Sequence, residues 1–141
     1  MSAEENAKLA RSLYDMFNKG DIDGMVAQAA ESVEVMGVPS GMTLHGPEGM
    51  RQYTQSWASA FPDAQIEITN VVVSEDSAVV EFRGRGTHTG PLVGPQGEIS
   101  PTGKAVDVPF CDIYQIKEGK ITSLRSYFDT ATLMGQLGLM G

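Results

Sequence analysis

The first third of the chain repeats apolar residues with the period of an α-helix. From Ala7 to Phe17 these residues recur at spacings of three and four, which puts them on one face of a helix ending near Gly20. Asp21 can then cap a short second helix whose apolar positions run as far as Ala29. Each of these helices has an apolar face that another part of the chain must cover.

A short strand over residues 33–36 and a third helix are expected next. Pro47 suits the first turn of that helix, and Glu48 adds an acidic side chain there. Apolar residues then recur at helical spacing as far as Phe61, and the following Pro62-Asp63 ends the helix.

Beyond the third helix the period of the pattern changes from about 3.6 residues to 2, which predicts that most of the remaining chain is strand. The predicted strands cover residues 65–74, 78–89, 105–117 and 120–128. Glu118-Gly119 joins the last two as a tight hairpin.

Two further segments complete the predicted order. Residues 90–103 contain four glycines and three prolines, which indicates a rim loop that is either a binding loop or a plain hairpin connection. Asp129 can cap a final short helix that reaches Gly138. Helices first and long antiparallel strands later indicate an α+β fold, and 141 residues fit a single domain over residues 1–141.

Charge and composition narrow the class of partner. The chain has 18 acidic and 10 basic residues, a net charge of −8, and the basic residues are scattered. Binding to nucleic acid or to an anionic membrane surface depends on clustered basic residues, so we expect neither. The N-terminal segment lacks the pattern of a signal peptide, no apolar run approaches a membrane span, and Cys111 is the single cysteine. A cytoplasmic protein is the simplest interpretation.

A series of short motifs runs along nearly the whole chain. They are Phe17-Asn18-Lys19-Gly20-Asp21, His45-Gly46-Pro47-Glu48-Gly49-Met50, Ala60-Phe61-Pro62-Asp63, Gly86-Thr87-His88-Thr89-Gly90, Pro101-Thr102-Gly103-Lys104, Asp112-Ile113-Tyr114, Glu118-Gly119-Lys120-Ile121, Tyr127-Phe128-Asp129 and Gln136-Leu137-Gly138. In their order they resemble the SnoaL-like polyketide cyclases of the NTF2-like superfamily. The resemblance implies a curved sheet wrapped into a cone, with a deep pocket between its concave face and the first and third helices. It predicts function less sharply than fold, because one fold hosts many functions.

The resemblance also implies a chemistry. Cyclases of this family close a ring by an intramolecular aldol reaction on a polyketide methyl ester, with neither metal nor cofactor, and an acidic side chain on the last strand takes the proton. In this chain that acid corresponds to Ser126, which has no comparable basicity. A histidine of the family corresponds to Asp112, a glutamine to Phe110 and an asparagine to Val35. The set of site residues is therefore altered.

Asp112 is the first candidate for the chemistry itself. Proton abstraction next to a carbonyl needs a base whose pKa an apolar environment raises toward neutrality. Asp112 lies two residues from both Phe110 and Tyr114, so the three side chains share one face of a strand. A carboxylate on such a face is costly unless it is hydrogen-bonded or functional. It is either an acid/base group in a pocket or a structural acceptor of amide or arginine hydrogen bonds.

His88 and Asp129 complete the catalytic candidates. A neutral His88 could donate to an enolate oxygen or exchange a proton with Asp112, or else it only orders the turn around it. Asp129 precedes Thr130 in a position that also suits a helix N-cap. The two histidines are far apart in sequence, which argues against a metal site, and neither is placed to activate Cys111. We expect no metal and no cofactor.

Aromatic side chains are expected to line the pocket as well as to fill the core. The candidates for contact with a substrate are Tyr14, Phe17, Tyr53, Trp57, Phe61, Phe110, Tyr114, Ser126 and Phe128.

Two functional hypotheses remain open at this point. One is a cofactor-independent polyketide cyclase or isomerase that acts on a bulky apolar carbonyl compound. The other is a small-molecule binding protein without catalysis, which the serine at position 126 favours. Besides these two, a third possibility is that the pocket is incidental and the domain serves to dimerise. The resemblance implies a homodimer that pairs through the outer face of the sheet, where Arg83, Arg85, Arg125 and Tyr127 would be displayed.

Overall fold

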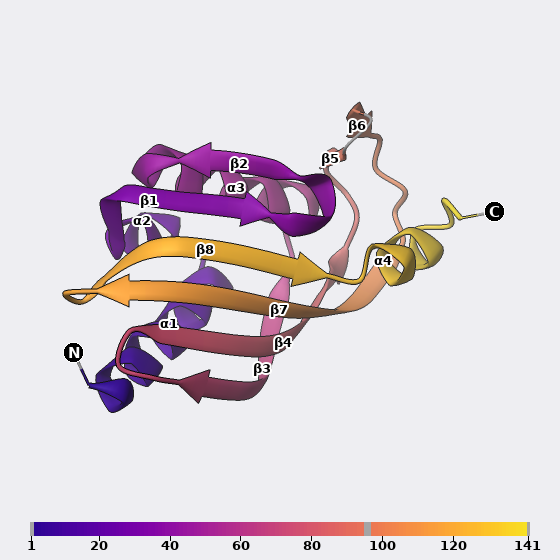
Figure 1. Cartoon of the computed structure of the whole chain (residues 1–141). Helices are drawn as coiled ribbons and strands as arrows, with labels where there is room; N and C mark the ends of the chain where they lie inside the picture. The colour runs from indigo at the N-terminus through magenta and orange to yellow at the C-terminus, as the bar shows by residue number, and fades with distance from the viewer. Residues whose placement is uncertain (1, 95–96, 141) are drawn as a thin grey trace.

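Three helices cover one face of a curved sheet (Figure 1). They are α1 (Ala3–Asn18), α2 (Ile22–Val26) and α3 (Gly46–Ala60). The computed structural model describes residues 2–94 and 97–140. The side chain of Asp21 accepts a hydrogen bond from the Gly24 amide and so caps α2, and Pro47 lies in the first turn of α3, both as predicted. No helix among the described residues is long and apolar enough to cross a bilayer.

The main sheet has six strands. Across the sheet they lie in the order β2 (Met42–His45), β1 (Ala29–Gly37), β8 (Lys120–Phe128), β7 (Ala105–Lys117), β4 (Ser77–Thr87) and β3 (Gln65–Val73). Neighbouring strands are antiparallel except for β1 and β8, which are parallel. At the β7–β8 turn, Glu118 and Gly119 both have positive φ, as a tight two-residue hairpin of this kind requires. The α+β cone expected from the sequence is confirmed.

Some boundaries differ from the predicted ones. Ala29, expected at the end of the second helix, instead begins β1, because α2 ends at Val26 and the chain there already pairs with β8. The predicted strand over residues 33–36 is therefore longer. The predicted 78–89 strand ends earlier, at Thr87, so His88 lies outside it.

Three short strands were not predicted at all. The edge strand β2 follows a 3-10 turn, η1 (Val38–Ser40), and has only four residues. The rim loop contains a small separate hairpin of β5 (Leu92–Gly94) and β6 (Gly97–Ile99). Strands of three or four residues are too short for an alternating pattern to indicate them.

Two apolar clusters fill the space between the layers. The first lies between the helices and the sheet and includes the fully buried Leu13, Val80 and Ile121. The second surrounds Val108 near the other end of the sheet, where α4 (Thr130–Gln136) packs through Leu133. The aromatic side chain of Phe110 packs against both clusters.

Candidate active site

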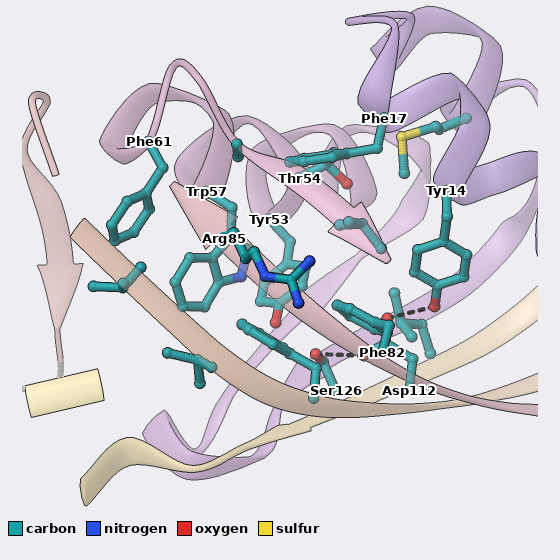
Figure 2. A pocket seen from close by; sticks show the side chains of 18 of the residues that line it. Tyr14, Phe17, Tyr53, Thr54, Trp57, Phe61, Phe82, Arg85, Asp112 and Ser126 are labelled. Atoms are coloured by element: carbon teal, nitrogen blue, oxygen red, sulfur yellow. Dashed lines mark hydrogen bonds between the residues drawn. The ribbon is translucent and has the colours of Figure 1, made fainter. Parts of the chain in front are cut away.

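A cavity of about 90 Å³ lies between the helices and the sheet (Figure 2). Its wall comes from all four helices and from β3, β4, β7 and β8, and it is largely apolar. Asp112 lines it. So do eight of the nine residues predicted to contact a substrate, namely Tyr14, Phe17, Tyr53, Trp57, Phe61, Phe110, Tyr114 and Ser126. Sequence positions from 14 to 126 thus meet around one carboxylate.

The carboxylate of Asp112 accepts hydrogen bonds from hydroxyl groups on three elements. Ser126, directly opposite on β8, donates to Oδ1 over 2.6 Å. Tyr14 of α1 donates to Oδ2 over 2.7 Å, and Tyr114 donates to the same oxygen over a longer 3.4 Å. The two tyrosine hydroxyls are 2.6 Å apart, so the four side chains form one connected polar group.

Among the described residues no cation pairs with this buried charge, because Arg85, which also lines the cavity, forms its ion pairs with Glu67 and Asp107. Asp112 is 5% exposed, and none of the salt bridges in the described part of the chain includes it. Burial disfavours the charged form and outweighs the three hydroxyl donors, so the pKa of Asp112 is raised to about 6. A carboxyl group with this pKa is mostly ionised at pH 7, yet it can readily take up and return a proton.

The tyrosines around Asp112 stay protonated. Burial, and then the negative charge of Asp112, raise the pKa of Tyr14 and of Tyr114 well above the ordinary value. Burial likewise raises the pKa of Tyr53. All three hydroxyls are therefore hydrogen-bond donors at neutral pH.

The hydroxyl of Tyr53 differs from the other two because it is buried and makes no hydrogen bond of ordinary geometry among the described residues, although Ser126 and Trp57 lie near enough to lower its pKa slightly against the larger effect of burial. It belongs to α3 and lies on the same side of the cavity as the Ser126 hydroxyl (Figure 2). An unsatisfied buried donor costs free energy, and in a cavity it is free to bind an incoming acceptor. The helical spacing indicated that Tyr53 faces inward, but no sequence signal shows that its hydroxyl is unpaired.

His88 does not join Asp112 in the cavity, contrary to the candidate set from the sequence. It is fully buried, its ring lies 5.4 Å from that of Phe61, and its Nδ1 accepts a hydrogen bond from the Thr102 amide. Burial lowers the pKa of His88, which keeps the imidazole neutral. The side chain therefore anchors the rim segment to the end of β4.

Asp129 is also outside the cavity. It is exposed and is the N-cap of α4, where it accepts hydrogen bonds from the amide and the hydroxyl of Thr132. Both bonds lower its pKa, which is the opposite of what a general base at neutral pH needs. The capping alternative therefore describes Asp129.

Phe128 and Cys111 have other surroundings. Phe128 lies edge-on to Trp57, with ring centroids 5.1 Å apart, and lines a neighbouring cavity instead. Cys111 is half-buried and alternates with Asp112 along β7, so it faces away from the site. Among the described residues, no three His, Cys, Asp or Glu side chains are grouped so that they could hold a metal ion.

Comparison with known proteins gives a family and a fold. The family model for SnoaL-like polyketide cyclase matches residues 7–137. No curated protein matches the sequence of this chain significantly.

Three solved structures illustrate the likeness in fold. A proposed SnoaL-like polyketide cyclase of Jannaschia sp. CCS1 superposes with a TM-score of 0.86 at 22% identity, over 99% of this chain and 95% of that one. TsrD of Streptomyces laurentii superposes with a TM-score of 0.84 at 25% identity, over 99% of both chains. AclR of Streptomyces galilaeus, a proposed hydroxylase, superposes with a TM-score of 0.82 at 20% identity, over 100% of this chain and 89% of that one.

Proposed function

Because this chain belongs to the SnoaL-like polyketide cyclase family, we propose that it is a cofactor-independent acid/base enzyme that acts on a bulky apolar carbonyl compound, as a polyketide cyclase or isomerase. One observation carries the proposal. A carboxylate with a pKa near 6, that of Asp112, lies in an apolar cavity that also contains the unpaired hydroxyl of Tyr53. A base and a hydrogen-bond donor are the two groups that enolate formation requires.

The proposed reaction begins when a carbonyl oxygen of the substrate accepts a hydrogen bond from Tyr53. Asp112 then takes a proton from the adjacent carbon, and the electron pair of that C–H bond passes to the carbonyl oxygen as an enolate. In a cyclase, the enolate carbon attacks a second carbonyl of the same molecule, a carbon–carbon bond forms, and the new alkoxide takes the proton back from Asp112. In an isomerase, Asp112 returns the proton to a different carbon.

The resemblance implies that the family's acid corresponds to Ser126, a serine in this chain. Ser126 lies on β8, and Asp112 is its direct cross-strand partner on β7. The two side chains are joined by a hydrogen bond of 2.6 Å. A base moved by one strand faces the same cavity, so the change at position 126 alters which strand supplies the base and does not remove it.

The alternative, a binding protein without catalysis, is favoured by a different observation. The carboxylate of Asp112 accepts three hydroxyl hydrogen bonds from the protein itself. Such a group could serve only to order the pocket. Turnover distinguishes the two functions, because a binding protein does not accelerate proton exchange.

The test measures deuterium exchange at the carbon next to the carbonyl of 2-tetralone, a two-ring apolar ketone, by NMR in D₂O. We expect the protein to accelerate exchange and Asp112→Asn to lose about 100-fold or more of that acceleration. Asp15→Asn is the matched control, because it makes the same change at an exposed position of α1. Equal acceleration by wild type and Asp112→Asn would remove Asp112 from the mechanism.

We further propose that the protein is a cytoplasmic homodimer paired through the sheet face opposite the helices. Residues that alternate with Asp112 and Ser126 occupy that face, among them Ile113 and Tyr127. Tyr127 is 40% exposed, which leaves a large apolar ring for a partner to cover.

A further inference from the structure

A second cavity of about 190 Å³ adjoins the first and is the larger of the two. It lies among α3, η1, β2, β5 and α4, at the end of the molecule where α4 and the rim hairpin meet (Figure 1). Tyr53, Trp57 and Leu133 line both cavities. These three side chains therefore form part of the boundary between the two spaces.

Trp57 is the largest of the shared side chains. Its ring lies edge-on to Phe110, which lines the first cavity, and edge-on to Phe128, which lines the second, with centroid separations of 5.4 and 5.1 Å. The side chain is only partly buried, so some of its surface still faces open space. An aromatic ring in this position can contact ligands on both of its sides.

The second cavity is lined by Ser40, Gln52, Ser56 and Thr130 as well as by apolar side chains, and both serine hydroxyls are bonded to the backbone. The Ser40 hydroxyl donates to the Gly37 carbonyl over 2.9 Å, and the Ser56 hydroxyl donates to the Tyr53 carbonyl over 2.6 Å. Met42 and Val93 line the same cavity and are 41% and 60% exposed. The serine donors are thus already used, and apolar side chains remain for a ligand to cover.

We propose that the second cavity is the distal part of the substrate site, and that it holds the apolar rings of a substrate whose reacting carbonyl lies at Asp112. The inference rests on the proposed function for the position of the carbonyl. Sites for organic ligands usually measure about 300–1,000 Å³. The inner cavity falls well below that range, so a bulky polycyclic ketone needs both cavities, whereas a one-ring ketone needs only the first. To occupy both, the ligand must displace or turn the indole of Trp57.

The test uses the fluorescence of Trp57, which is the single tryptophan of the chain. Two probes differ only in length, acetophenone with one ring and 2-acetylanthracene with three fused rings, and each is titrated while quenching of the indole is followed. Ser56→Phe places a ring in the second cavity. Gln55→Phe is the matched control, because it adds the same ring to an exposed position of α3 that does not line either cavity.

We expect Ser56→Phe to weaken binding of 2-acetylanthracene at least tenfold and to change that of acetophenone less than twofold. Gln55→Phe is expected to change neither. If Ser56→Phe fails to fold by circular dichroism, Ser40→Phe fills the cavity from the opposite wall. Equal effects of the substitution on both ketones, no effect on either, or no binding of the long ketone to the wild type overturns the inference.

The same titration on Asp112→Asn separates this inference from the proposed function. We expect Asp112→Asn to retain the size-dependent pattern while it loses deuterium exchange. Size-dependent binding without exchange in the wild type would contradict the enzyme proposal alone. Exchange in the wild type together with unchanged 2-acetylanthracene binding in Ser56→Phe would contradict the two-cavity proposal alone.

Discussion

The carboxylate of Asp112 is a costly group for this fold to retain. It is buried, it has no cation beside it in the described part of the chain, and its charge is compensated by hydroxyl donors alone. Burial without a cation raises the pKa, and a raised pKa means that ionisation opposes folding. The proposed base, Asp112, therefore lowers the free energy of unfolding at neutral pH.

This cost has a definite dependence on pH. The pKa of Asp112 rises from 3.8 to about 6 on folding, so between these values the folded chain binds more protons than the unfolded chain. The contribution of Asp112 to stability is thus present below pH 4 and is lost as the pH rises through 6. The free energy of unfolding is expected to fall by about 3 kcal/mol through this effect.

Urea unfolding of wild type and Asp112→Asn between pH 4 and pH 7.5 measures this effect, because the difference between the two proteins cancels the other titrating groups. We predict that the free energy of unfolding of the wild type falls relative to that of Asp112→Asn across this range. A difference that stays constant with pH would show that Asp112 titrates as an ordinary aspartate.

Tyr53 and Tyr14 give a matched pair of single-hydroxyl deletions. Tyr53→Phe removes an unpaired buried hydroxyl, so we expect stability to hold or rise while deuterium exchange falls about 100-fold. Tyr14→Phe removes a donor to Asp112, so we expect it to lower the free energy of unfolding by about 1–3 kcal/mol. Thermal melts and the 2-tetralone assay check both, and full activity in Tyr53→Phe would exclude its hydroxyl from the mechanism.

For single residues, the sequence predicted which way a side chain faces better than it predicted which other side chains it contacts. Alternation along one strand indicated that Asp112, Phe110 and Tyr114 share a face, and all three line the cavity. The hydrogen bond between Tyr14 and Asp112 joins residues 98 positions apart, and no local pattern carries that information. For His88 the sequence left two roles open, and its bond to the Thr102 amide just beyond the end of β4 fits the structural one.

The rim segment is held to the third helix by its backbone. The amides of Thr89 and Gly90 both donate to the carbonyl of Ala60, at the end of α3. The approach is so close that a Cβ at position 90 would lie 1.8 Å from the carbonyl oxygen of Ser59. Glycine at this position is therefore a requirement of the contact between the two elements.

Gly90→Ala is accordingly predicted to lower the free energy of unfolding by about 1–3 kcal/mol, because the rim must move away from α3. Gly135→Ala is the matched control. A Cβ there meets nothing within 4 Å, and alanine favours the helix α4, so we expect a gain of about 0.5–1 kcal/mol. Urea unfolding measures both, and a neutral Gly90→Ala would mean that this contact does not constrain the rim.

Long helices and strands were predictable from the sequence, and short ones were not. The α1 and α3 helices and the β7 and β8 strands each extend over enough residues for periodicity to indicate them, and β7 and β8 match their predicted bounds. The parallel pairing of β1 with β8 joins segments from opposite ends of the chain. A single sequence contains no register signal between such distant segments.

At the scale of the whole molecule, the two cavities are what remains after helices and sheet have packed. Their existence depends on how closely α3, α4 and the rim approach one another, and that distance is not encoded in any one segment. The resemblance to the family indicated one pocket. The division of that space by Trp57 became visible only in three dimensions.

The proposed homodimer is also a statement about the whole molecule. Ile113 lies at the middle of β7 on the face opposite the helices, so Ile113→Glu would place a charge in the interface. We predict that analytical ultracentrifugation finds a dimer for the wild type and a monomer for Ile113→Glu. Glu118→Gln, at the hairpin turn away from this face, is expected to remain dimeric. A monomeric wild type would contradict the proposal.

The most direct test is the pKa of Asp112 itself, measured by NMR titration of ¹³C-labelled aspartate carboxyl groups, with Asp112→Asn used to assign the signal. We predict a midpoint near pH 6 for Asp112. A midpoint near 4 would mean that water or further donors reach the carboxylate, and the proposed base would then be contradicted.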